Sequence, residues 1–219
     1  MSRNLTAETA EVPEAGEVLT PEQVGSVGAD RLFTLRPIPD EVFRRMEGKS
    51  FGTECTTPRE ELRYLRVLHR GFDKQTHIGE LVCHQSVAQD LLEVLRMLWE
   101  QDYPIEKMIL IDEYGADDEA SMADNNSSCF NFRTVAGKTE LSNHATGKAI
   151  DINPLYNPYI TQRGFTPLNA GPYVDRSRDF SYKIDENDLC YRLMTDRGFE
   201  WGGHWSHAKD YQHFQRISE

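Results

Sequence analysis

The sequence has few cysteines, no long apolar run and a shortage of positive charge, and each absence excludes a class of protein. Four cysteines are spread over 219 residues, and no two stand in a Cys-x-x-Cys pair. This spacing argues against a zinc site built from thiolates, while the even count leaves zero, one or two disulfides open. A membrane-crossing helix needs a run of about 20 consecutive apolar residues, and no stretch of this sequence comes close to that length.

The charge balance excludes duplex nucleic acid as a partner. The chain has 24 Lys and Arg against 36 Asp and Glu, a formal net charge of -12. A surface of this sign repels phosphates, and no basic stripe interrupts it. Solubility alone accounts for such an excess of acid.

The N-terminal residues carry no visible sorting signal. Residues 1–28 lack both the basic n-region and the apolar h-region of a secretory signal peptide. Residues 1–30 show no sustained hydrophobic period, so we expect a flexible N-terminal extension. With 38% hydrophobic and 27% charged residues, residues 31–219 are then expected to form a single globular domain.

Hydrophobic periodicity predicts helices and strands that do not alternate regularly. The clearest element is an amphipathic helix over 86–102, closed by Pro104. A short helix follows Pro39, and another is expected over 186–197, capped by Asp185 and ended by Gly198. Strands are predicted over 61–69, 80–84, 108–111, 130–135, 148–152 and 213–217. An irregular order of this kind favours an α+β fold over a doubly wound sheet.

Two long polar segments, 115–129 and 153–184, are predicted to be loops. The first contains paired aspartates and a run of asparagine and serine, and the second is rich in Pro, Tyr, Asn, Arg and Gly. Loops of this length in a compact domain often carry function.

His144 and Asp151 flank a predicted turn and strand that could form half of a metal site. Side chains two apart in a strand share a face, so Asp151 would point away from the core that receives Ile150 and Ile152. A charged Asp between isoleucines is costly unless it is paired or metal-bound. Gly147 stands where the chain must turn, at a position that favours a positive φ. Taken alone, His144 is also compatible with a surface loop.

His213 opens the last predicted strand and completes the candidate triad. If this strand neighbours the one that carries Asp151, then His144, Asp151 and His213 converge on one ion. Three nitrogen and oxygen ligands fill three positions of a tetrahedral zinc and leave the fourth for water. A rival cluster of His204, His207, Asp210 and His213 recurs every three residues, but glycines and aromatic residues interrupt a clean helix there.

Asp210 is our candidate for the general base. Three residues before a ligand is a spacing that can bring its carboxylate within hydrogen-bond reach of the zinc-bound water. The alternative is a carboxylate that caps a helix or forms a salt bridge.

Four further residues are candidates for contact with substrate. Arg133 could hold an anionic group or the developing oxyanion, or be an ordinary strand arginine. Ser142 could donate a hydrogen bond to substrate or cap the turn before His144. His204, together with His207, is expected at the rim of the site, and Trp205 could form a wall of the pocket or belong to the core. His69, His77 and His84 have no partner pattern, and we assign them no role.

Two motifs together resemble a known family. The first, SxHxxGxAxD, runs from Ser142 to Asp151, and the second, WGGxWxxxxDxxHF, runs from Trp201 to Phe214. The pair is similar to the M15 peptidases, the D-Ala-D-Ala carboxypeptidase and L-Ala-D-Glu endopeptidase group that trims bacterial peptidoglycan. The resemblance covers roughly residues 60–218.

The resemblance implies a hedgehog/DD-peptidase-type α+β fold, in which a central antiparallel sheet flanked by helices carries one zinc. It implies His144, Asp151 and His213 as zinc ligands, Asp210 as base, and an arginine, here matched to Arg133, that steadies the tetrahedral intermediate. The expected substrate is a peptidoglycan stem peptide or a D-Ala-terminated peptide. We further expect a monomer that acts in the cell envelope or outside the cell, with an export signal that is not part of this chain; the less favoured alternative is a cytosolic protein.

Two other functions stay open at this point. One is a zinc-bearing binding module similar to hedgehog signalling domains, which would hold the metal without turnover. The other is a different metal hydrolase, such as an amidase for a small substrate. The choice between a carboxypeptidase and an endopeptidase depends on the shapes of the two polar loops.

Overall fold

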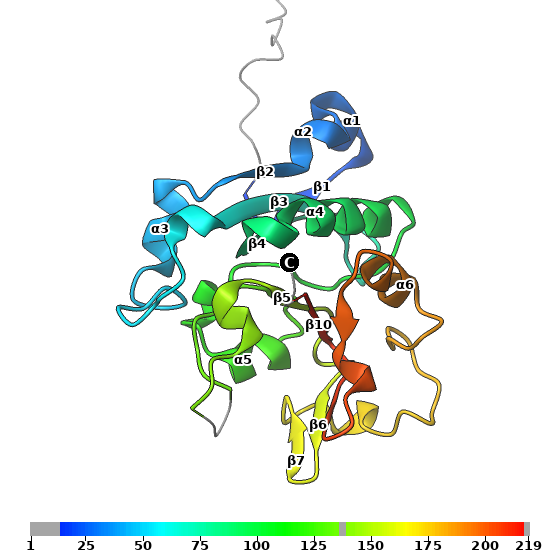
Figure 1. The fold of residues 1–219 in the computed structure, drawn as a ribbon. Helices are drawn as coiled ribbons and strands as arrows, with labels where there is room; N and C mark the ends of the chain where they lie inside the picture. The colour runs from blue at the N-terminus through cyan, green and yellow to red at the C-terminus, as the bar shows by residue number, and fades with distance from the viewer. Residues whose placement is uncertain (1–13, 136–138, 217–219) are drawn as a thin grey trace, which may run out of the picture.

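The chain combines three small antiparallel sheets with short helices (Figure 1). A computed structural model describes residues 14–135 and 139–216. The α+β class predicted from the sequence is confirmed, but strand pairing is divided among three sheets rather than gathered in one central sheet.

The largest sheet has four strands in the order β1-β4-β3-β2. Its centre is a hairpin of two nine-residue strands, β3 (Leu62–Arg70) and β4 (Thr76–His84), which pair along their whole length. The edges are β1 (Val18–Leu19) and β2 (Thr34–Pro37). The strands predicted over 61–69 and 80–84 are therefore confirmed, and the second begins four residues earlier than expected.

Helix α4 (Gln85–Glu100) packs against this sheet and forms the main core with it (Figure 1). Its buried side chains recur at spacings of three and four: Val87, Leu91, Val94, Leu95 and Leu98. Burial of each such side chain contributes about 1.5–3 kcal/mol. The helix predicted over 86–102 is thus confirmed. Among the described residues, no helix is both long and apolar enough to span a membrane.

The segment before residue 31 is more ordered than its composition indicated. Residues 1–13 lie outside the described part, but α1 (Pro21–Val27) and α2 (Ala29–Leu32) follow β1 directly. Thr20 and Gln23 close a capping box at the start of α1. Leu19 and Leu32 are buried in the main core. The expectation of a flexible extension is therefore wrong for residues 14–30, because isolated apolar side chains there anchor short elements to the sheet.

The remaining helices are short: α3 (Asp40–Met46), α5 (Asp118–Ala123) and α6 (Leu189–Thr195). The last is shorter than the helix predicted over 186–197. Asp188, not Asp185, caps it, accepting hydrogen bonds from the N–H groups of Cys190 and Tyr191. Asp185 instead closes the preceding turn, where its carboxylate accepts from the N–H of Asn187.

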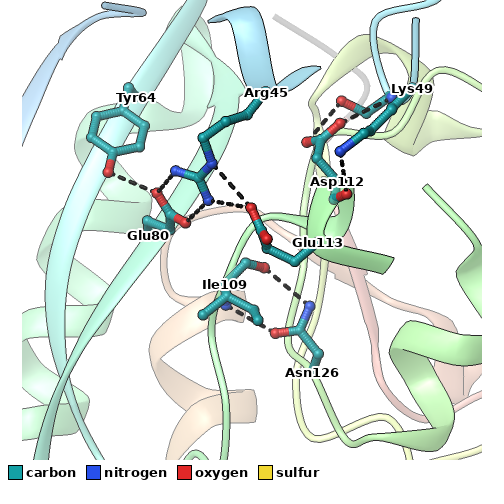
Figure 2. A network of polar contacts seen from close by, with 9 residues as sticks. Arg45, Lys49, Tyr64, Glu80, Ile109, Asp112, Glu113 and Asn126 are labelled. Carbon is teal, nitrogen blue, oxygen red and sulfur yellow. Dashed lines mark hydrogen bonds and ion pairs between the residues drawn. The ribbon is translucent and has the colours of Figure 1, made fainter. Parts of the chain in front are cut away.

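Two predicted strands are absent from the described residues, although the apolar segment over 108–111 is buried as expected. The amide side chain of Asn126 bonds both the N–H and the C=O of Ile109, and so takes the place of a neighbouring strand (Figure 2). Ile111 already begins a 3-10 helix, Ile111–Tyr114. Residues 130–135 likewise find scattered partners and form only one isolated bridge.

A polar network ties α3 to the four-stranded sheet (Figure 2). The carboxylate of Glu80, 1% exposed, accepts hydrogen bonds from the guanidinium of Arg45 and from the hydroxyl of Tyr64 at 2.8 Å. The same guanidinium also reaches Glu113 at 2.9 Å. A fully buried carboxylate is tolerated here because charged and neutral donors occupy both of its oxygens.

Two smaller sheets hold the C-terminal half. One has the order β5-β10-β8, formed by β5 (Ala149–Asp151), β10 (His213–Gln215) and β8 (Glu200–Trp201). The other has the order β7-β6-β9, formed by β7 (Gly164–Thr166), β6 (Tyr159–Thr161) and β9 (Lys209–Asp210). The segment 115–129, predicted to be a loop, contains α5, and the segment 153–184 contains β6, β7 and a 3-10 helix, Gly171–Tyr173. The rest of both segments is irregular, as predicted. All four cysteines are free thiols.

Candidate metal centre and catalytic pocket

The strands that carry Asp151 and His213 are neighbours. In the antiparallel pair β5/β10, Asp151 lies directly opposite His213, and Phe214 lies opposite Ile150. Residues directly opposite each other in such a pair place their side chains on the same face. Ile150 and Phe214, both fully buried, point to the other face and into the core. The alternation expected around Asp151 is confirmed.

His144 reaches the same point from a 3-10 helix, Asn143–Thr146. The hydroxyl of Ser142 caps this helix and accepts from the N–H of His144 at 3.3 Å. Gly147 ends it with a φ of +70°, the left-handed conformation expected of that position. A Cβ at Gly147 would lie 2.7 Å from the backbone nitrogen of His84, so the glycine also permits a close approach to β4.

The three predicted ligands converge. Nε2 of His144 lies 3.2 Å from Oδ2 of Asp151, and Nδ1 of His213 lies 3.1 Å from Oδ1 of Asp151. The same two ring nitrogens are 3.1 Å apart. All three residues are at most 5% exposed. Within residues 14–135 and 139–216, this is the group of His, Cys, Asp and Glu side chains that could hold a metal ion.

The outer hydrogen bonds of the two imidazoles favour a cation between them. Nδ1 of His144 lies 2.6 Å from the carbonyl oxygen of Cys129, and Nε2 of His213 lies 3.0 Å from Oε1 of Gln215. Both oxygens only accept, so both ring nitrogens must donate. The lone pairs of the other two nitrogens then face each other, an arrangement that needs a proton or a metal ion between them. The residues present therefore fit a metal ion.

The charges of the triad are consistent with this arrangement. Burial opposes ionisation of Asp151, but the charges and hydrogen bonds of His144 and His213 hold its pKa well below its usual range. Burial also opposes protonation of His213, but the hydrogen bond and charge of Asp151 raise the pKa of this imidazole to about 9. An ionised carboxylate thus favours positive charge at the centre of the triad.

Asp210 lies in β9 and lines the same cavity as the triad. Its Oδ1 atom is buried and has no hydrogen-bond partner among the described residues. Burial raises the pKa of this carboxyl to about 7, and the charge of Asp151 adds to the rise against the opposing charge of His213. An unpaired oxygen with such a pKa can accept and release a proton near neutrality.

The two glycines before His204 allow the chain to pack closely behind Asp210. A Cβ at Gly202 would lie 2.6 Å from the carbonyl oxygen of Asp210, and a Cβ at Gly203 would lie 2.5 Å from the ring of Trp201. The indole N–H of Trp201 donates to the carbonyl of Tyr211 at 2.9 Å. The Trp-Gly-Gly sequence therefore sets the backbone that carries Asp210 and His213.

The cavity over the triad has a volume of about 400 Å³ and is lined by Arg133, Ser142 and Trp205, as predicted. The ring of Trp205 lies 5.2 Å from that of His213. A larger cavity of about 670 Å³ lies elsewhere, over Glu80 on the four-stranded sheet, and includes none of the triad. The chemistry of the residues, rather than size, identifies the smaller cavity as the candidate site.

Arg133 has a partner that the sequence did not reveal. Its guanidinium forms an ion pair of 2.6 Å with Asp118, which also lines the cavity from α5. Nε of Arg133 is buried without a hydrogen-bond partner among the described residues. Arg133 thus lines the cavity over the triad, but the carboxylate of Asp118 already balances part of its charge. The paired aspartates at 117 and 118 were the only sequence feature pointing to such a partner.

His204 does not line the cavity. Its ring is half exposed, pairs with Glu186 at 3.0 Å and packs edge-on against Trp201. We therefore no longer expect His204 to contact substrate, and it does not join a metal cluster with His207 and His213. Its contacts with Glu186, Tyr191 and Trp201 hold the ring outside the lining of the cavity.

Tyr159 and Gln215 are among the residues of the cavity wall that sequence reasoning missed. Tyr159 lies directly opposite Asp210 in the β6/β9 pair, so the two side chains share a face. Gln215 follows His213 by two residues on β10 and also lines the cavity. The spacing of two could have indicated Gln215, whereas no local pattern indicates Tyr159, because β6 is only three residues long.

Comparison with known proteins supports the resemblance seen in the two motifs. Residues 136–216 match an M15 peptidase family model described as D-alanyl-D-alanine carboxypeptidase. This segment includes His144, Asp151, Asp210 and His213. Searches of the curated proteins and of the solved structures returned no match. Both motifs, Ser142 to Asp151 and Trp201 to Phe214, thus lie within the segment of the chain that is similar to the M15 peptidases.

Proposed function

We propose that this protein is a zinc-dependent peptidase that hydrolyses amide bonds in peptidoglycan stem peptides. The observation that carries the proposal is the convergence of His144, Asp151 and His213 in a cavity that also holds the unpaired carboxylate oxygen of Asp210. The family match over residues 136–216 supports the choice of a D-Ala-containing substrate. Such a substrate lies in the cell envelope or outside the cell, and we place the activity there.

The donor set favours zinc over calcium and magnesium. Two imidazole nitrogens and one carboxylate oxygen are a ligand set found in catalytic zinc sites, whereas calcium and magnesium prefer oxygen donors alone. Zinc supplies a Lewis acid that polarises a scissile carbonyl and lowers the pKa of water. The hedgehog/DD-peptidase-type fold implied by the motifs is part of the same proposal.

The chain's own residues carry the remaining steps. Asp210 accepts a proton from the attacking water at its unpaired Oδ1 and later gives it to the leaving amine. Arg133 interacts with the carboxylate of the peptide or with the oxyanion as it develops. Ser142 lies at the cavity wall next to His144, and the ring of Trp205 provides an apolar surface beside His213.

The proposal is tested with the zinc-loaded protein and a synthetic stem pentapeptide ending in D-Ala-D-Ala, followed by digestion of purified sacculi. Mass spectrometry of the products identifies the bond that is cut. We expect Asp210→Asn to reduce kcat by about 10²–10⁴-fold while zinc binding persists, because Asp210 is not one of the three ligands. His204→Ala serves as the matched control, because His204 does not line the cavity, and this variant should cleave like the wild type.

Each result has a distinct meaning. Cleavage by Asp210→Asn at the wild-type rate refutes the role of the base. Tight zinc binding without turnover of either substrate refutes the peptidase and leaves a binding module. Turnover of small amides but not of stem peptides refutes the substrate class alone.

A further inference from the structure

Gln215 connects the candidate metal centre to two further polar side chains. It is 5% exposed and lies two residues after His213, on the same face of β10. Its Oε1 accepts from Nε2 of His213 at 3.0 Å and from the side-chain amide of Asn143. Its Nε2 donates to Oε2 of Glu200 at 3.3 Å.

These partners determine which way the amide of Gln215 points. Asn143 presents an N–H group to Oε1, and Glu200 presents a carboxylate to Nε2. The reversed amide would place two NH₂ groups against each other and an oxygen against a carboxylate, and would lose both hydrogen bonds. The atom that faces His213 is therefore an oxygen, and the ring nitrogen opposite it must carry a hydrogen.

The consequence is a defined tautomer of His213. When Nε2 carries the hydrogen of a neutral imidazole, Nδ1 keeps its lone pair and presents it to the triad. His144 uses the opposite nitrogen, Nε2, because the backbone carbonyl of Cys129 accepts from its Nδ1 at 2.6 Å. No side-chain substitution removes a backbone carbonyl, so of these two orienting contacts only the one made by Gln215 depends on a side chain.

We propose that Gln215 is a positioning residue that holds His213 in the Nε2–H tautomer, and that Asn143 and Glu200 hold Gln215 in turn. The inference rests on the proposed function, since it assigns His213 as a ligand through Nδ1. Without the amide oxygen, the ring of His213 loses its fixed orientation and exposes either nitrogen to the triad. Loss of an outer partner of this kind typically weakens metal binding about 10- to 100-fold.

The experiment compares two substitutions that differ in the acceptor oxygen. Gln215→Met keeps the length of the side chain and removes the oxygen. Gln215→Glu keeps an acceptor at the same position, and it is combined with Glu200→Gln so that the new carboxylate still meets a donor rather than a second carboxylate. The zinc dissociation constant is measured by competition with a chromogenic chelator. The imidazole nitrogens of the zinc-loaded protein are then observed by ¹H–¹⁵N NMR with labelled histidine. Gln215→Leu replaces the Met variant if that variant does not fold.

We expect about 10- to 100-fold weaker zinc binding for Gln215→Met and loss of the slowly exchanging Nε2–H signal of His213. The double variant Gln215→Glu with Glu200→Gln should keep both the signal and most of the affinity. Wild-type protein that fails to bind zinc refutes the proposed function. Wild-type protein that binds zinc, together with a Met variant of equal affinity and unchanged imidazole signals, refutes the role of Gln215 alone.

Discussion

Replacing Gly147 by alanine should destabilise the protein by two separable effects. The residue has a φ of +70°, and an L-residue in this left-handed conformation costs about 1–2 kcal/mol. The new Cβ would also lie 2.7 Å from the backbone nitrogen of His84 and 3.1 Å from the carbonyl carbon of Cys83. These are main-chain atoms of a central strand, and they cannot rotate away.

The close contact cannot relax easily, because a hydrogen bond holds the two segments together. The N–H of His84 donates to the carbonyl of Gly147 at 2.9 Å. Overpacking in such a site typically costs about 1–3 kcal/mol. The two effects together predict a loss of about 2–5 kcal/mol in the free energy of unfolding.

Gly115 supplies a matched control. It has a φ of +65°, and a Cβ added there meets nothing within 4 Å. Gly115→Ala should therefore show the conformational cost alone, about 1–2 kcal/mol. Urea denaturation of the metal-free proteins measures both losses, and their difference isolates the contact with His84. Zinc titration should show weaker binding for Gly147→Ala only, since this turn lies between His144 and the strand that carries Asp151.

Equal losses for the two variants would falsify the reasoning, because the close approach to β4 would then contribute nothing. Unchanged zinc affinity in a destabilised Gly147→Ala protein would contradict the second part, which links this turn to the position of the ligands.

Two further predictions concern stability away from the site. Glu80→Gln leaves buried donors of Arg45 or Tyr64 without a charged acceptor and should lower the free energy of unfolding by about 2–4 kcal/mol. Glu113→Gln changes the exposed partner of the same guanidinium (Figure 2) and should lower it by less than about 1 kcal/mol. Similar losses for the two variants in urea denaturation would show that burial is not decisive. Burial lowers the pKa of His69 to about 4. Between a pH of about 6.5 and 4, the imidazole is therefore protonated in the unfolded chain but not in the folded protein. The free energy of unfolding should fall by up to about 3 kcal/mol as the pH drops over this range. His69→Asn should show a shallower fall over the same range, and parallel curves would contradict the assignment.

The metal triad could be predicted from the sequence because each ligand belongs to a short local pattern. Asp151 stands in an Ala-Ile-Asp-Ile run, where alternation sends the isoleucines to the core and leaves the carboxylate on the other face. Gly147 marks the turn before it, and His213 opens a strand with Phe214 as its buried neighbour. Alternation over only three residues was enough to assign the two faces of the Asp151 strand, because the side chains of the face opposite Asp151 are both isoleucine.

The parts that could not be predicted depend on contacts between distant segments. The buried run over 108–111 has strand-like composition, but the side chain of Asn126 satisfies the backbone groups that a strand would pair. The ion pair of Arg133 with Asp118 joins an irregular segment to α5, and only the paired aspartates at 117 and 118 pointed to it. His204 occupies a motif position, yet its ring is half exposed and contacts Glu186 and Trp201 rather than the cavity. Propensity describes a segment by itself, whereas these outcomes are decided by the partners that the fold brings to it.

The main chain itself holds the candidate site in place from two sides. On one edge, β5 pairs with β10, which sets Asp151 opposite His213. On its other edge, Asp151 exchanges two backbone hydrogen bonds with Ser128, at 2.9 and 3.2 Å. The next residue, Cys129, is the one whose carbonyl orients His144. One segment therefore fixes both the backbone of the first ligand strand and the ring of the histidine, so the ligand geometry is set by backbone pairing before any metal ion binds. This explains how a three-residue strand, too short to be stable alone, can carry a precise site.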